Sequence, residues 1–150
     1  MADSEELTID KALYKWIKKV KNAAELSEAD RLDINMAGAQ VFEKALIDET
    51  NAKHRSTHND KAYGHAADGI GMYAPKGTAN DFGVKLGDFV VGWKNRYHAM
   101  NMLRINDGTK KLIGDQFVTN LRHNSTVRSD MLKAEKARYD EILRKKQEED

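Results

Sequence analysis

The sequence feature that most restricts the fold is a long stretch of helical periodicity over residues 32–52. Small and apolar residues recur there at helical spacing in two adjacent rows: Ile34, Gly38, Val41 and Ala45, and then Ala39, Phe42 and Leu46. Ser27 can cap the start of this helix, and Asp30 suits its first turn, where backbone NH groups attract negative charge. Because the two rows form a broad apolar face, we predict a central helix buried in the core.

A shorter amphipathic helix is predicted at residues 10–22, with Asp10 as its N-cap. One face carries the apolar residues Leu13, Trp16, Ile17 and Val20, and the other faces carry Lys15, Lys18, Lys19 and Lys21. We expect residues 1–26 to contribute this helix as a peripheral flap that packs on the body of the protein.

The spacing changes to that of strands in the middle of the chain. Residues 70–74 and 84–94 are predicted to be strands joined by a hairpin loop that contains Pro75. Gly87 and Gly92 within the second strand indicate a bulge or a close backbone neighbour. The segment 97–105 fits either a helix or a strand.

The last third of the chain is predicted to be a long helix from about residue 115, with a break near residues 123–126 and frayed residues at 143–150. The turn before it, Asn106-Asp107-Gly108, needs a residue that tolerates positive φ, which Gly108 supplies. Helices, strands and a final helix in this order predict an α+β fold, and 150 residues suit a single domain over 1–150.

Composition excludes several classes of protein. The absence of cysteine rules out a disulfide framework, and a formal net charge of +1 is too low for a general nucleic-acid coat. No apolar run reaches the roughly 20 residues of a membrane helix. The acidic start, MADSEELTID, differs from a signal peptide.

Motifs for catalysis or cofactor binding are equally weak, and we expect no catalytic, cofactor or metal site. His54, His58 and His65 lie close in sequence, but Arg55 stands where a zinc protease motif needs glutamate, so we interpret them as surface histidines. Around Lys110 and Lys111 the glycines stand in the wrong order for a phosphate-binding loop. No serine has the Gly-x-Ser-x-Gly context of a hydrolase nucleophile.

A family resemblance covers residues 60–147 and depends on the order of several short motifs. These are Gly64-His65-Ala66-Ala67-Asp68-Gly69-Ile70, Val90-Val91-Gly92-Trp93, Asn106-Asp107-Gly108-Thr109-Lys110-Lys111 and Phe117-Val118 before a charged terminal helix. The order resembles that of the neck proteins of long-tailed phages, the head–tail joining or tail-completion family related to the lambda minor tail protein Z type. In that family a "VGw" strand end precedes "GTkk", and a "pF" segment opens the last helix. Here Gln116 replaces the proline.

The resemblance implies a structural virion protein, made in the cytoplasm of the host bacterium, that forms a ring in the phage neck. The ring would be a hexamer or a dodecamer, with non-specific DNA in its channel and with connector or stopper and tail-terminator or tail-tube proteins as neighbours. The expected subunit interface comprises Phe82, Trp93, Asp107, Gly108, Thr109, Lys110, Lys111, Ile113 and Phe117, with Lys110 and Lys111 also candidates to face DNA.

Two alternatives remain open from the residues themselves. Trp93 could serve only the core of the protein. The lysine-rich face of the first helix could make the chain a small DNA-binding or regulatory module.

Overall fold

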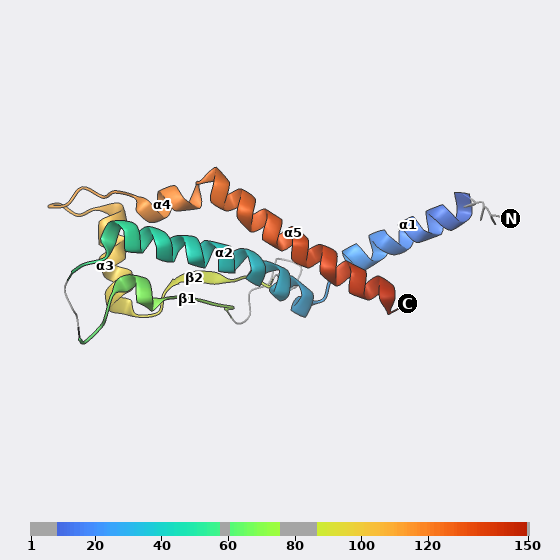
Figure 1. Ribbon diagram of the computed structural model, residues 1–150, viewed down its shortest axis with the longest axis horizontal. Coiled ribbons are helices and arrows are strands. Elements are labelled where there is room, and N and C mark those ends of the chain that lie inside the picture. The colour runs from blue at the N-terminus through green and yellow to red at the C-terminus, as the bar shows by residue number, and fades with distance from the viewer. Residues whose placement is uncertain (1–8, 58–60, 76–86, 150) are drawn as a thin grey trace.

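The computed structural model describes residues 9–57, 61–75 and 87–149 and confirms the predicted α+β class. Its elements in chain order are α1 (Ile9–Ala24), α2 (Glu28–His54), the 3-10 turn η1 (Ala66–Gly69), β1 (Ile70–Tyr73), β2 (Val90–Trp93), α3 (Arg96–Asp107), α4 (Phe117–Arg122) and α5 (Ser125–Glu148). The body is elongated: α5 runs beside α2, the two strands lie on another side of α2, and α1 extends from one end (Figure 1).

Helix α2 is the central helix that the sequence predicts. The Ser27 hydroxyl accepts a hydrogen bond from the backbone NH of Asp30 at 3.1 Å, and the Asp30 carboxylate accepts one from the NH of Ser27 at 3.1 Å. This reciprocal cap satisfies two NH groups that would otherwise lack partners at the helix start. Leu46 and Ala39 of α2 are buried, which confirms the broad apolar face.

The sheet is an antiparallel pair in which Ile70 lies opposite Trp93 and Tyr73 opposite Val90. The second strand is shorter than predicted because Gly87, with φ of 74°, turns the chain onto α2. The Gly87 carbonyl accepts a 2.8 Å hydrogen bond from the Asn35 amide, and a Cβ on Gly87 would lie 2.9 Å from the Leu32 nitrogen. The predicted close neighbour is thus confirmed at Gly87.

The second glycine of that strand behaves differently. A Cβ on Gly92 would meet no heavy atom within 4 Å, so the prediction of a close backbone neighbour is wrong at this glycine. The predicted hairpin loop, apart from Pro75, and the predicted strand start at Val84 lie outside the described residues.

The ambiguous segment 97–105 is part of helix α3, which Asn95 caps by accepting a 2.7 Å hydrogen bond from the NH of Tyr97. The long terminal helix is divided at His123 and Asn124 into α4 and α5, as predicted. Asn124 caps α5 through a 3.0 Å hydrogen bond from the NH of Val127. Helix α5 continues to Glu148, through most of the residues that the sequence predicts to be frayed.

The core lies where α2, the sheet, α3 and α4 meet. Its buried members are Leu46, Ile70, Met102, Phe117 and Leu121, with Phe42, Trp93, Ile105 and Val127 packed around them. Every one of these elements places at least one large apolar side chain in this cluster, so the cluster holds the elements together.

Ion pairs fasten α5 to α2 away from that core. The Arg138 guanidinium donates to the Asp33 carboxylate and, at 2.8 Å, to Glu141 on its own helix. Near the start of α2, Lys146 contacts Asp30 at 2.9 Å, and this hydrogen bond holds the pKa of the Asp30 carboxyl below its usual range. Glu141 also lies 3.3 Å from Lys145, one helical turn further along α5.

Helix α1 corrects the prediction of a packed flap. Its apolar residues Leu13, Trp16, Ile17 and Val20 are all exposed, with 61% of the Trp16 surface open to solvent. Helix α1 extends away from the body (Figure 1), and in the short link that follows it the Glu25 carbonyl accepts a 3.3 Å hydrogen bond from Lys146. Asp10 lies in the first turn of α1 and is not its N-cap, since α1 begins at Ile9.

Candidate assembly surfaces

The loop over residues 108–114, between α3 and α4, is narrow at its base because two glycines face each other there. Gly108 has φ of 88°, which confirms the predicted positive φ, and it forms a bridge with Ile113. Asn106 and Asp107, predicted to belong to the turn, are instead the last residues of α3. A Cβ on Gly108 would lie 2.7 Å from the Gly114 nitrogen, and one on Gly114 would lie 2.5 Å from the Asn106 carbonyl oxygen. The two sides of the loop can therefore approach this closely only because neither Gly108 nor Gly114 carries a side chain.

The buried amide of Asn106 ties this base to helix α4. Its Oδ1 accepts hydrogen bonds from the NH groups of Val118 at 2.9 Å and Thr119 at 3.2 Å, and its Nδ2 donates to the Thr119 hydroxyl at 3.0 Å and to the Asp107 carboxylate at 2.8 Å. Gln116, at the N-cap position of α4, makes no side-chain cap and adopts the left-handed conformation. Asn106 thus caps α4 from α3.

Asp115 connects the same base to α2. One oxygen of its carboxylate accepts from the NH of Phe117 at 3.1 Å, and the other lies 2.7 Å from Nε2 of His54. The His54 ring also packs on Phe117, with ring centroids 4.5 Å apart. His54 is therefore a half-buried structural residue and not the surface histidine that the sequence indicates, whereas His58 lies outside the described residues.

The tip of the loop is ordered by Thr109. Its hydroxyl accepts from the NH groups of Lys111 at 3.2 Å and Leu112 at 3.1 Å, and its own NH donates to the Leu112 carbonyl at 2.8 Å. This arrangement holds Lys110, Lys111 and Leu112 in solvent and leaves Ile113 95% exposed. The loop projects from the end of the molecule opposite α1 (Figure 1).

The residues predicted to form an interface therefore separate into three groups. Thr109, Lys110, Lys111 and Ile113 lie together on the projecting loop, with Asp107 and Gly108 at its base. Phe117 is fully buried and Trp93 is half-buried with its ring against Phe117, so both support the loop from within the core. Phe82 lies outside the described residues.

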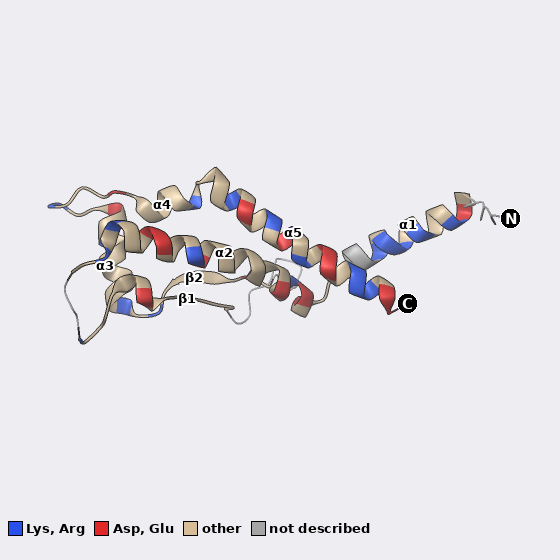
Figure 2. Cartoon of the chain, viewed as in Figure 1, with Lys and Arg blue, Asp and Glu red and all other residues tan. Residues whose placement is uncertain are grey.

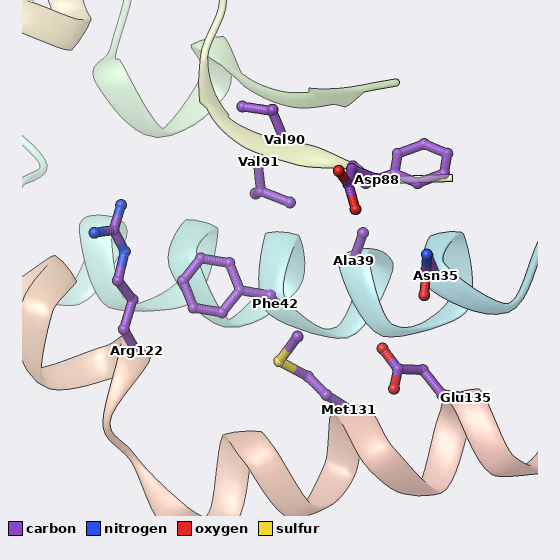
Figure 3. Close-up of a pocket in the computed structure, with 10 residues that line it drawn as sticks. Asn35, Ala39, Phe42, Asp88, Val90, Val91, Arg122, Met131 and Glu135 are labelled. Carbon is purple, nitrogen blue, oxygen red and sulfur yellow. The ribbon is translucent and has the colours of Figure 1, made fainter. Parts of the chain in front are cut away.

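Sequence reasoning missed a cavity of about 500 Å³ between α2, α5 and β2. Figure 3 shows Phe42, Val91 and Met131 around it, with Arg122 at one end and Glu135 at the other. Asp88 and Asn35 add polar groups, but the residues around the cavity form no pair of nucleophile and base and no metal-ligand set. Within the described ranges as a whole, no three histidine, aspartate or glutamate side chains are grouped to hold a metal ion.

A second groove, of about 510 Å³, lies between the first half of α2 and α5. Its apolar residues are Leu26, Ile34, Leu132 and Tyr139. Leu132 is 66% exposed. The signal for the exposure was present in the sequence: Leu132 directly follows Met131, and two consecutive helix positions point about 100° apart.

Glu135 borders both the cavity and the groove. The carboxylate lies over Gly38 of α2, where a Cβ would come 2.8 Å from its carboxyl carbon. Burial raises the pKa of the Glu135 carboxyl, and among the described residues no cation pairs with it. Glu135 is thus a partly buried negative charge that a binding partner could compensate.

Among the described residues, no helix is both long and apolar enough to cross a bilayer. Comparison of the chain with protein-family models, curated proteins and solved structures finds no match.

Proposed function

We propose that the chain is a structural protein of the phage neck, which joins the head or its connector to the tail as a ring through which DNA passes. The observation that carries this proposal is the 108–114 loop, where a rigid base presents the almost fully exposed Ile113 beside two lysines. Holding an apolar side chain in solvent does not stabilise a monomer, whereas in an assembly it provides a contact that is already in place before the subunits bind.

The sequence resemblance indicates which kind of assembly this loop would join. The "GTkk" motif of the neck family falls on residues 108–111, which run from the base of this loop at Gly108 to its tip, and the family's "pF" position falls on Phe117, which anchors the loop. In this proposal Ile113 and Leu112 contact a neighbouring subunit or ring. Lys110 and Lys111 lie at the edge of the contact or face the phosphates of DNA in the channel.

The role is one of assembly, without catalysis or a cofactor. Copies of the chain would form a hexamer or a dodecamer between a connector or stopper protein and the tail-terminator or tail-tube proteins, and the finished protein would reside in the virion.

Phage assembly with an Ile113→Asp variant tests the proposal. We expect filled heads and separate tails to accumulate, because the new charge would be buried at the joint, while Asp130→Asn on the exposed face of α5 leaves assembly unchanged. Normal yields of infectious particles with Ile113→Asp would contradict the proposal.

The alternative of a DNA-binding module has one observation in its favour. Helix α1 carries five lysines and stands clear of the body, as Figure 2 shows. A gel-shift assay separates the two functions: a DNA affinity that falls steeply with salt and is lost on reversing the charges of Lys15 and Lys18 would favour the module.

A further inference from the structure

The apolar stripe of α1 is the largest exposed apolar feature of the described structure that the proposed function does not use. Leu13, Trp16, Ile17 and Val20 are each about half exposed or more, and Ile9 continues the stripe toward the start of the helix. Such a stripe on a helix that extends from the body is typical of a segment that packs on another surface.

Charge excludes a second α1 as that surface. The helix carries five lysines and one aspartate, a formal net charge of +4 over Ile9–Ala24. At 100° per residue, Lys19 and Lys21 fall on either side of the stripe. Two α1 helices packed through their stripes would bring these lysines together, so the complementary surface must be apolar and carry an uncompensated negative charge.

The chain itself contains such a surface in the α2–α5 groove. Leu26, Ile34, Leu132 and Tyr139 provide the apolar floor, and Leu132 is mostly open to solvent. Two cations line the groove: Lys136, which is paired with Asp140 at 2.7 Å, and Arg31, which has an interaction of its own. The Glu135 carboxylate has no cation partner among the described residues. An amphipathic helix flanked by lysines would cover the floor and neutralise Glu135.

We propose that α1 of one copy lies with its apolar stripe in the α2–α5 groove of a second copy, with Lys19 or Lys21 close to Glu135. The proposal does not depend on the neck assignment. Folding of α1 back onto its own groove is disfavoured because it would disrupt the link between α1 and α2, where the Glu25 NH donates to the Lys21 carbonyl at 2.9 Å and the Glu25 carbonyl accepts from Lys146. A second copy requires no such rearrangement.

The size of the contact fits a reversible association. The exposed parts of five large apolar side chains and the facing groove amount to about 1,000 Å² of total buried surface, at the low end for specific interfaces. Since the donor helix and the acceptor groove are different surfaces, the contact is head-to-tail and can be repeated from copy to copy, closing into a ring or continuing as a filament.

The absence of cysteine from the chain makes the contact directly testable by cross-linking. One chain would carry Val20→Cys in the stripe, and a second chain, made heavier by a tag, would carry Leu132→Cys in the groove. A short bis-maleimide linker added to the mixture is expected to give several-fold more cross-linked heterodimer than the same mixture with Lys15→Cys on the opposite face of α1. Adding Trp16→Glu to the stripe chain should abolish the excess.

Charge exchange provides a second readout. Glu135→Lys in the groove chain is expected to lower the yield of heterodimer, and Lys19→Glu with Lys21→Glu in the stripe chain to restore it. Glu135→Gln should lower the yield without altering the circular dichroism spectrum, which separates lost binding from lost folding.

Several outcomes would overturn the proposal: no excess over the Lys15→Cys control, homodimers of the Val20→Cys chain alone, or only internal links in a chain with both cysteines. A fourth is binding of the wild-type chain to vesicles rich in phosphatidylserine, lost in Trp16→Glu, without any cross-linked heterodimer. In that case a lipid surface, and not a second copy, would cover the stripe.

Discussion

Two regions of this protein expose apolar side chains, and they are held in different ways. The 108–114 loop is short and fastened from three sides, by the facing Gly108 and Gly114, the Asn106 amide, and the contact of Asp115 with His54. Helix α1 is joined to the body by a short link, and among the described residues no apolar group covers its stripe. In the proposed assembly the loop would be a preformed contact that loses little entropy on binding, whereas α1 would be positioned largely by its partner.

Phe117→Ala is expected to cause the largest loss of stability, because it removes the ring that anchors the 108–114 loop. The ring is fully buried between His54 and Trp93, so its removal leaves a cavity and should cost about 3–5 kcal/mol of unfolding free energy. Urea denaturation followed by circular dichroism measures the change. A cost near zero would show that the loop is not anchored through the core.

Asn106→Ala should be the next largest, at about 2–3 kcal/mol, because it leaves the NH groups of Val118 and Thr119 without their acceptor inside the protein. Asn101→Ala, at a half-buried position of the same helix where the amide oxygen accepts a long 3.5 Å hydrogen bond from Arg104, is the matched control and should change stability by less than about 1 kcal/mol. Equal effects of the two variants would contradict the capping role of Asn106.

Gly108→Ala tests the narrow base of the loop itself. Positive φ and the approach of the Gly114 nitrogen predict a loss of about 1–3 kcal/mol, again by urea denaturation. Gly92→Ala is the control, since a Cβ there meets nothing within 4 Å. A Gly108→Ala variant as stable as the wild type would mean that the base can open.

Ile113→Asp should prevent assembly without lowering the stability of the single chain. The side chain is almost fully exposed, so the unfolding free energy should change by less than about 0.5 kcal/mol while assembly fails. A large loss of stability would instead place Ile113 in the fold of the monomer.

Glu135→Gln should have a small effect on stability that depends on pH. Burial raises the pKa of its carboxyl in the folded state, so the charged form destabilises the free protein at neutral pH. Glu135→Gln should therefore stabilise the chain at pH 7, by less than about 1 kcal/mol since the carboxylate is partly solvated. The gain should vanish as pH falls through the raised pKa to below the unfolded value, where Glu135 is protonated in both states. Thermal melts at pH 3.5 and pH 7 measure it.

The sequence predicted best those features that depend on local chemistry. The cap at Ser27, the positive φ of Gly108 and the break before Ser125 each follow from one or two residues with a strong backbone preference. The strand after Gly87 was predicted too long, because a hydrogen bond to Asn35, more than fifty positions away, sets where the chain turns.

The candidate assembly surfaces were harder to predict from the sequence, because they depend on how the elements pack. Periodicity identified the apolar stripe of α1 but not that it would lie exposed, because exposure depends on how the helix is placed relative to the body. In the same way Phe117, expected at an interface, is the most deeply buried residue of the loop's support. The role of Glu135 has no signal in the sequence, because its burial arises only where α5 crosses Gly38.

Cryo-electron microscopy of assembled phage particles tests the central claim most directly. We expect a ring of this chain between the connector and the tail tube, with Ile113 of each copy buried against a neighbouring subunit. Particles that contain no copy of the chain, or a ring in which the 108–114 loop lies free in solvent, would contradict it.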